Sequence, residues 1–223
     1  MTFNKLMAAA TIVTTGVLAG QVRAAFDLRI TEIWSGQDGA DITEDWIEVT
    51  NYGDLVWTAA TDGDLYVEDA SGSDGITDAV LVQGLTGIAP GESVIILFED
   101  DGTGAATFNA AWGDPGVSVG YADGGGIGLG GSGDDSYLFL AGGTLLDSAG
   151  YPDTGGSPTE TESWDVLLGT WSTIGNASDA YASTALGGAG ADTPAIGSPG
   201  AIVPEPAALM LIGLSGLAAM RRH

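Results

Sequence analysis

Short apolar runs separated by glycine clusters make up most of this chain. Residues 28–31 and 47–50 alternate apolar and polar side chains with a period of two, as in strands that bury one face. Residues 94–98 are apolar without interruption, which is typical of a strand covered on both faces. Between the two chain ends, no segment shows a sustained helical period. The 37 glycines fall between these runs, where turns are expected. The pattern therefore predicts an all-β protein.

Seven segments have the length and composition of strands, and turn signals separate them. They are Phe26–Trp34, Asp45–Tyr52, Asp64–Asp69, Ala79–Gln83, Ser93–Phe98, Ser136–Ala141 and Thr144–Tyr151. Seven short strands of this kind predict a β-sandwich over residues 25–185. Gly124–Gly133 is poor in apolar residues and is predicted to be a long mobile loop. The Gly-, Ala- and Pro-rich residues 186–202 are predicted to be a spacer that holds the domain off the membrane.

The N-terminus has the three parts of a secretory signal peptide. Lys5 precedes an apolar stretch from Leu6 to Gly20, and small residues follow at the positions that a signal peptidase recognises. We expect residues 1–24 to be removed between Ala24 and Ala25, after export through the Sec machinery.

The C-terminus has a second three-part pattern, over residues 203–223. Pro204, Glu205 and Pro206 come first, an apolar run of 14 residues follows, and Arg221 and Arg222 come near the end. As a helix the run would span about 21 Å, short of the hydrocarbon core of about 30 Å. It therefore suits a transient membrane segment, held by a basic stop on the cytoplasmic side, better than a permanent anchor.

This tail resembles the PEP-CTERM sorting signal of Gram-negative bacteria. The resemblance implies that a membrane exosortase recognises Pro204–Pro206 and removes the apolar segment. It also implies a destination in the cell envelope, at the cell surface or in the extracellular matrix. Proteins with this signal commonly accompany exopolysaccharide and biofilm production.

The charge of the chain excludes one class of partner. The sequence holds 30 Asp and Glu against five Lys and Arg, and Arg29 is the one base between the terminal signals. A body this anionic repels phosphate backbones, which excludes nucleic acid as a direct partner. The hydrophobic fraction of 44% and the six Trp argue against disorder.

The strand segments carry a second resemblance, to the lamin-tail domain, an immunoglobulin-like β-sandwich. The ordered series that carries it is Ile30–Ile33, Asp45–Asn51, Leu65–Asp69, Ile88–Val94, Ser132–Leu138, Leu146–Tyr151 and Ser198–Gly200. The resemblance covers most of residues 28–200 and implies an immunoglobulin-like fold. Residues 58–63 and 99–126 depart from the family pattern.

Few catalytic arrangements are open to this composition. Cysteine is absent and the one histidine is His223, so the body has no residues for a Ser-His-Asp triad, a Cys-His pair or a histidine-bound metal. A carboxylate pair remains possible because acids are frequent. We expect Glu32 and Glu48 to be buried structural carboxylates and the protein not to be an enzyme.

Two binding alternatives remain open. Ser35–Asp41 and Ser71–Asp78 share a Ser-Gly-x-Asp-Gly core, and Asp100, Asp101 and Asp134 add carboxylates in glycine-rich loops. Such loops can supply the six to eight oxygen ligands of Ca²⁺, although solvated turns explain them equally well. Trp164 and Trp171 are candidates for glycan contact, or for a cap on the core.

The sequence thus predicts an exported, non-enzymatic sandwich that is sorted by its tail and has a structural or interaction role. A carbohydrate- or calcium-dependent binding or adhesion module is the alternative. No cofactor is expected apart from possible calcium. The expected partners are exosortase, the export machinery, exopolysaccharide, and the membrane through the tail before processing.

Overall fold

The computed structural model describes residues 25–36, 43–69, 75–98, 100–124, 126–130, 133–152, 162–176, 178–186 and 194–201. The predicted signal peptide and sorting tail lie outside these residues. Within them the fold is mostly β, as predicted. No helix of this described part is long and apolar enough to cross a membrane.

Ten strands form one mixed sheet in the order β10-β9-β4-β5-β8-β7-β2-β1-β11-β12. The strands predicted from the sequence are β1 (Leu28–Trp34), β2 (Trp46–Asn51), β4 (Leu65–Glu68), β5 (Val80–Gln83), β7 (Ser93–Phe98), β9 (Asp134–Leu140) and β10 (Thr144–Tyr151). The sequence analysis missed β8 (Ser118–Ala122), β11 (Trp164–Asp165) and β12 (Thr170–Trp171). It also missed two small sheets, β3 (Trp57–Thr58) with β6 (Gly87–Ile88), and β13 (Tyr181–Leu186) with β14 (Pro194–Gly197).

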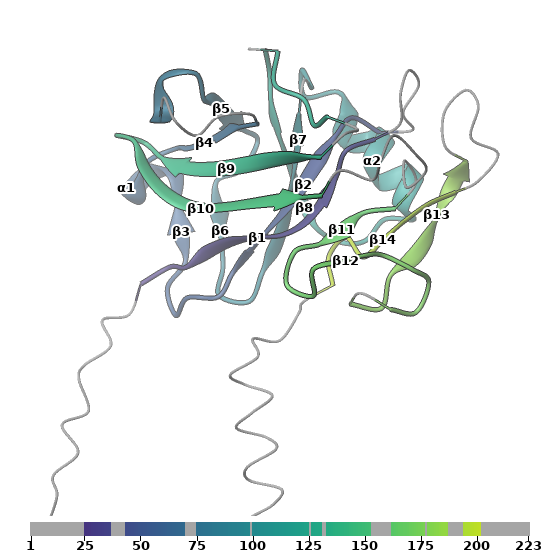
Figure 1. The fold of residues 1–223 in the computed structure, drawn as a ribbon. Coiled ribbons are helices and arrows are strands. Elements are labelled where there is room, and N and C mark those ends of the chain that lie inside the picture. Colours follow the sequence, from purple (N-terminus) through teal and green to yellow (C-terminus); the bar gives the residue numbers. More distant parts are fainter. Residues whose placement is uncertain are drawn as a thin grey trace, which may run out of the picture.

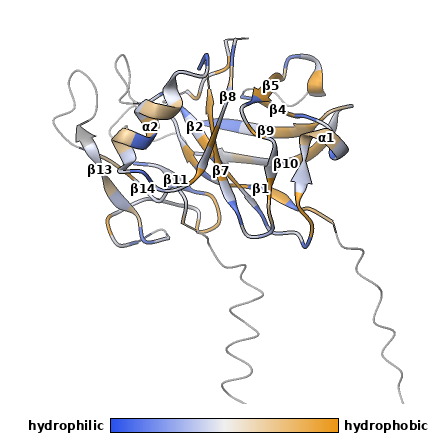
Figure 2. Ribbon diagram, turned by 180° about the vertical axis from the view of Figure 1, so that it is seen from behind, coloured by the Kyte–Doolittle hydropathy of each residue, from blue (hydrophilic) through white to orange (hydrophobic). Residues whose placement is uncertain are grey.

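The large sheet curls so that its two halves face each other (Figure 1). Strands β10, β9, β4 and β5 form one half, and β8, β7, β2 and β1 begin the other. Only two residue pairs join the halves at the β5–β8 boundary, Val82 with Ala122 and Gln83 with Tyr121. Apolar side chains from both halves meet in one buried core. Figure 2 shows the hydrophobic stretches of the strands in orange. The members of the core include Val49, Val67, Ile96 and Leu138.

The apolar run of β7 is covered on both faces, as its sequence predicts. Val94, Ile96 and Phe98 join the core between the two halves. Ile95 and Leu97 point the other way, into a second apolar cluster with Phe108 and Trp112. All six residues of β7 are buried.

The second cluster depends on a helix that the sequence analysis missed. Helix α2 (Gly104–Trp112) connects β7 to β8, and these two strands are parallel. A parallel pair needs a crossover connection, and α2 provides it. The helix is only nine residues long, so its buried residues Phe108, Ala111 and Trp112 make one turn of helical spacing, too short to stand out as a period. The other helical segments are one turn each, α1 (Ala59–Asp62) and the 3-10 turn Gly75–Thr77.

Strand β1 contains a bulge that changes which residues face the core. Ile30 pairs with Val49 and Glu32 pairs with Glu48, which leaves Thr31 as the extra residue. The core positions of β1 are accordingly Leu28, Ile30 and Ile33. Because of this shift, Glu32 lies on the outer face of the sheet, opposite Glu48.

Two segments predicted to lie outside the core contribute to it. In Gly124–Gly133, predicted to be a mobile loop poor in core residues, Ile127 and Leu129 are buried with 3% and 6% exposure. In residues 186–202, predicted to be a spacer, Pro194–Gly197 is strand β14, and Ala195 is fully buried. The folded body therefore extends to Ala201, beyond the predicted boundary at residue 185.

Candidate functional site

The most unusual feature of the body is a row of three buried acids across neighbouring strands. Glu32 of β1 pairs with Glu48 of β2 on one side and with Asp165 of β11 on the other. Directly paired residues point to the same face of a sheet, so the three carboxylates lie side by side on the outer face. None is more than 2% exposed.

Each glutamate is held by hydrogen bonds from the body. Glu32 accepts bonds from the Ser163 hydroxyl, from the Ser198 amide at 2.8 Å and from the Ser198 hydroxyl at 3.1 Å. Glu48 accepts from the Thr31 hydroxyl at 2.8 Å and from the Gly200 amide at 2.6 Å.

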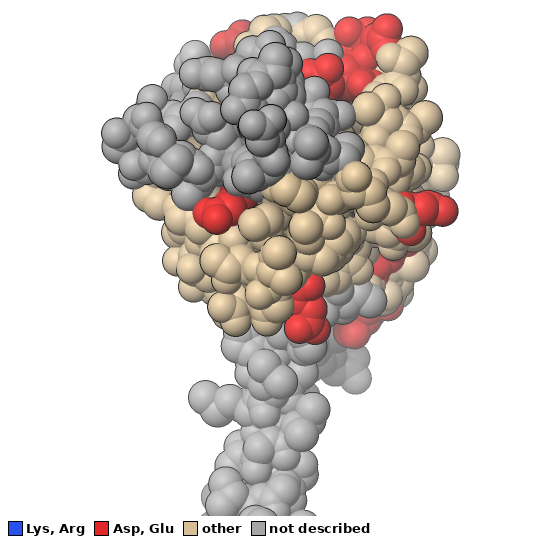
Figure 3. Space-filling model, turned by 90° about the vertical axis from the view of Figure 1, so that its right-hand side faces the viewer, with Lys and Arg blue, Asp and Glu red and all other residues tan. Residues whose placement is uncertain are grey.

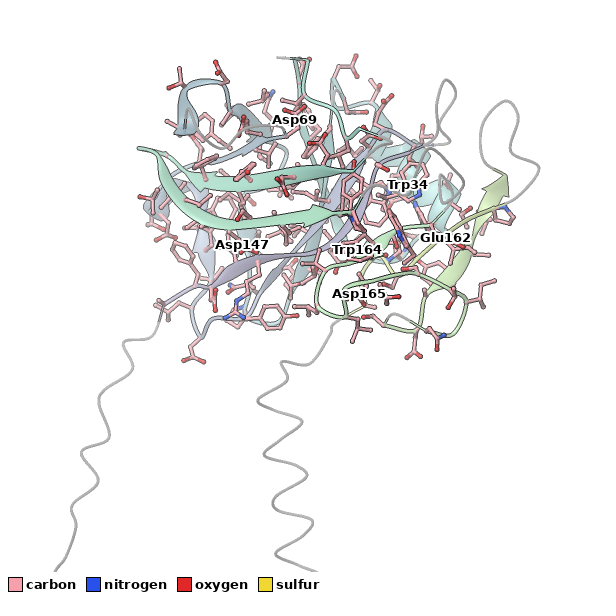
Figure 4. All side chains as sticks on the ribbon, viewed as in Figure 1. Trp34, Asp69, Asp147, Glu162, Trp164 and Asp165 are labelled. Carbon is pink, nitrogen blue, oxygen red and sulfur yellow. The ribbon has the colours of Figure 1, made fainter. Side chains whose placement is uncertain are left out.

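Asp165 is satisfied in a similar way at the other end of the row. Its carboxylate accepts bonds from the Leu168 amide at 2.8 Å and from the Ser178 hydroxyl at 2.9 Å. Figure 4 labels Asp165 and its neighbour Trp164 on β11, which pairs with β1 at Glu32 and Ile33.

The surroundings favour the protonated form of the two glutamates. Burial raises the pKa of Glu32 to about 7, although the bonds from Ser163 and Ser198 oppose the shift. Burial and the neighbouring Glu32 raise the pKa of Glu48 to about 8. The pair therefore retains protons near neutral pH. Both glutamates are buried, as predicted.

A second group of acids binds the backbone of one short segment at an end of the core. The amides of Gly128, Leu129 and Gly130 donate to Asp69, Asp45 and Asp134 at 2.8, 2.7 and 2.9 Å. These aspartates stand at the ends of β4, β2 and β9, so three strands fasten one short segment. We call Ile127–Gly130 the plug, because its two apolar side chains enter the core.

The plug explains part of the acidic composition without a metal. The loops Ser35–Asp41 and Ser71–Asp78 lie partly outside the described residues. Among the described Asp and Glu, no group of three or more is arranged to hold a metal ion. Asp100 instead accepts bonds from the Gly102 and Gly104 amides at the start of α2. Other acids stand in separate groups on the surface (Figure 3).

Strand β10 approaches β1 without pairing with it through the backbone, and side chains bridge the two. Asp147 of β10 accepts a bond from the Ile30 amide at 2.8 Å, where the bulge of β1 begins. Asp147 itself stands at an irregularity in the pairing of β10 with β9. This carboxylate links β10, one end strand of the curled sheet, to the part of β1 that β11 does not pair with.

The two candidate glycan contacts, Trp164 and Trp171, lie together near the contact between β10 and β1. Their rings meet edge to face with centroids 5.2 Å apart, and Trp171 meets Tyr151 in the same manner at 6.1 Å. Both indoles are half-buried against the core. The edge-to-face geometry means that the two rings do not form one flat platform for a sugar.

The remaining predicted site residues belong to the terminal signals. Ala24, Pro204, Glu205, Pro206, Arg221 and Arg222 lie outside the described residues. Ala25 is the first described residue, and its carbonyl accepts a bond from the Asp54 amide at 3.0 Å.

Sequence reasoning found Glu32 and Glu48 but missed Asp165 and Ser198 as their neighbours. The only local signal for Ser198 was the Ser-Pro-Gly sequence, which indicates a turn but not what the turn covers. Comparison of the chain with protein-family models and with curated proteins finds no match.

Proposed function

We propose that this chain is an exported surface or matrix protein of a Gram-negative bacterium, with a structural or interaction role and no enzymatic activity. The observation that carries the proposal is the ordered sorting pattern of Pro204–Pro206, an apolar run and Arg221–Arg222. On this proposal an exosortase recognises the pattern at the membrane, and the product associates with exopolysaccharide or biofilm.

The use of the acids in the body supports a structural role. Carboxylates of the kind that glycosidases use are present, but Glu32 and Glu48 are sealed and bonded to the body's own groups. Asp45, Asp69 and Asp134 bind backbone amides of the plug. These acids stabilise the fold instead of presenting a reactive cleft.

We further propose that the body is an immunoglobulin-like sandwich of the lamin-tail type. The order of the seven predicted strands and the two facing halves of the sheet support this assignment. The β7–α2–β8 crossover falls in residues 99–126, where the sequence departs from the family pattern.

The sorting proposal is tested by intact-mass analysis of the protein released from its native cells. We expect a mass that lacks residues 1–24 and the apolar tail. A product that is intact through His223 would overturn processing by an exosortase.

The glycan-binding alternative rests on Trp164 and Trp171 and has its own test. A screen against exopolysaccharides would compare the natural protein with Trp164→Phe and Trp171→Phe, which keep an aromatic ring in the packed pair. Binding that both variants weaken would favour the binding module. If the natural protein binds none of the glycans, the structural role would be favoured.

A further inference from the structure

The last described turn of the chain closes over the two buried glutamates. The Ala201 amide bonds the Ser198 carbonyl at 2.9 Å, Pro199 follows Ser198, and Gly200 has φ of +83°. Proline followed by a residue of positive φ is the signature of a type II turn. We call Ser198–Ala201 the latch turn.

The latch turn is fastened chiefly through the glutamates. Two of its amides make no bond within the turn: the Ser198 amide donates to Glu32, and the Gly200 amide donates to Glu48. The fit is close, because a Cβ at Gly197 would lie 3.0 Å from the Glu32 carboxylate, and one at Gly200 would lie 2.7 Å from Val117. In the sequence, only Ile202 and Val203 separate the latch turn from Pro204.

The charges around the pair are all acidic or neutral. Asp165 of β11 faces Glu32, and Tyr181 of β13 has its pKa raised to about 12 by burial and by the two glutamates. The other groups are the hydroxyls of Ser93 in β7 and of Ser172, the residue after β12, which join the hydrogen-bond network. Arg29, the one base of the body, pairs with Asp27 at 2.5 Å.

We propose that the latch turn is a proton-dependent latch: it stays closed while the Glu32–Glu48 pair holds its protons and detaches from the two glutamates when both are ionised, while β14 stays paired with β13. Two adjacent buried anions repel each other and lose the solvation that water would give them. Opening exposes both to water, and it frees the segment that leads to the tail. The latch is a property of the body and does not depend on whether the tail is processed.

The direction of the pH effect follows from proton binding. The closed state holds protons that the open, solvated state releases, so rising pH favours opening. The closed state is fully favoured below about pH 4.5, the ordinary pKa of a glutamate. It becomes less stable relative to the open state as pH rises through the raised pKa values, about 7 for Glu32 and about 8 for Glu48.

Hydrogen exchange of the full chain, followed by mass spectrometry between pH 5 and pH 9, tests the proposal. After correction for the intrinsic pH dependence of exchange, protection of the latch turn, residues 198–201, should fall about tenfold or more over this range. Protection of β9, which lies in the opposite half of the sheet, should change little. In Glu48→Gln the fall in protection of residues 198–201 should be clearly smaller than in the natural protein, because glutamine keeps an acceptor for Gly200 and leaves Glu32 as the only titrating member of the pair.

Asp147→Asn is the matched control, since Asp147 also accepts a backbone amide, but from Ile30 of β1 and not from the latch turn. It should retain the natural pH response. If Glu48→Gln does not fold, Glu32→Gln serves the same purpose, and the profile of the natural protein is informative alone. Constant protection from pH 5 to pH 9 in the natural protein would overturn the proposal. So would an unchanged pH response in a folded glutamine variant.

Discussion

Hydrogen bonds from single carboxylates join several parts of this body that are distant in sequence. Glu32 bonds Ser198, Asp147 bonds Ile30, and Asp45 bonds Leu129. Each bond satisfies a backbone amide that would otherwise be buried without an acceptor, and such a loss costs about 1–3 kcal/mol. In a chain with one base in its body, acids therefore serve as acceptors for amides more than as partners of cations.

Glu48→Gln should stabilise the protein at alkaline pH. The raised pKa of Glu48 means that its ionised form is disfavoured in the folded state, and glutamine removes that penalty. We expect a gain on the order of 2 kcal/mol at pH 9 and little change at pH 5, measured by urea unfolding. Asp64→Asn, which removes one charge from an exposed position, is the control. An equal gain in both variants would attribute the effect to net charge alone.

Asp147→Ala should open the seam between β10 and β1. The Ile30 amide would lose its acceptor, with an expected loss of about 1–3 kcal/mol in the free energy of unfolding. Asp147→Asn keeps an acceptor oxygen and should stay close to the natural protein. Equal losses in the two variants would show that the charge, and not the hydrogen bond, matters at this position.

At the scale of elements, two short segments complete the core. The plug supplies Ile127 and Leu129 at one end, and α2 covers the outer face of β7 with Phe108 and Trp112. Neither segment is long enough to show a period, yet these four side chains are buried. Their contribution depends on position and not on composition.

Leu129→Ala should therefore cost as much as a core mutation. We expect a loss of about 2–5 kcal/mol in urea unfolding, because a cavity would remain beneath the plug. Leu168→Ala, at a position with 59% exposure, should change stability by no more than about 0.5 kcal/mol. If the plug only rested on the surface, Leu129→Ala and Leu168→Ala would show similarly small losses in the free energy of unfolding.

At the scale of the whole molecule, net charge opposes compaction. The chain carries a formal charge of −25 at pH 7, and on the face that Figure 3 shows the acids stand in separate groups. Repulsion between exposed acids is screened by salt, whereas the buried row of Glu48, Glu32 and Asp165 is screened much less.

Thermal melts should show this difference. Raising NaCl from about 10 mM to about 0.3 M should raise Tm by several degrees, since the screening length shortens from about 30 Å to less than 10 Å. CaCl₂ and MgCl₂ at matched ionic strength should act alike if the effect is screening. A larger shift with CaCl₂ would support the calcium-dependent alternative, and no shift with any salt would contradict the role of surface repulsion.

The sequence by itself determined the seven principal strands, the two-sided burial of β7 and the burial of Glu32 and Glu48. These depend on local alternation, on apolar runs and on turn residues, which act over a few neighbouring positions. Only the tertiary structure decided that Glu32 faces Glu48 and that Ser198–Gly200 covers them. A one-residue bulge at Thr31 sets the first, and a contact across 166 residues sets the second. The tertiary structure likewise decided the burial of the plug and of α2, because each segment is too short to show a pattern and its apolar side chains are buried only where the curled sheet leaves space for them.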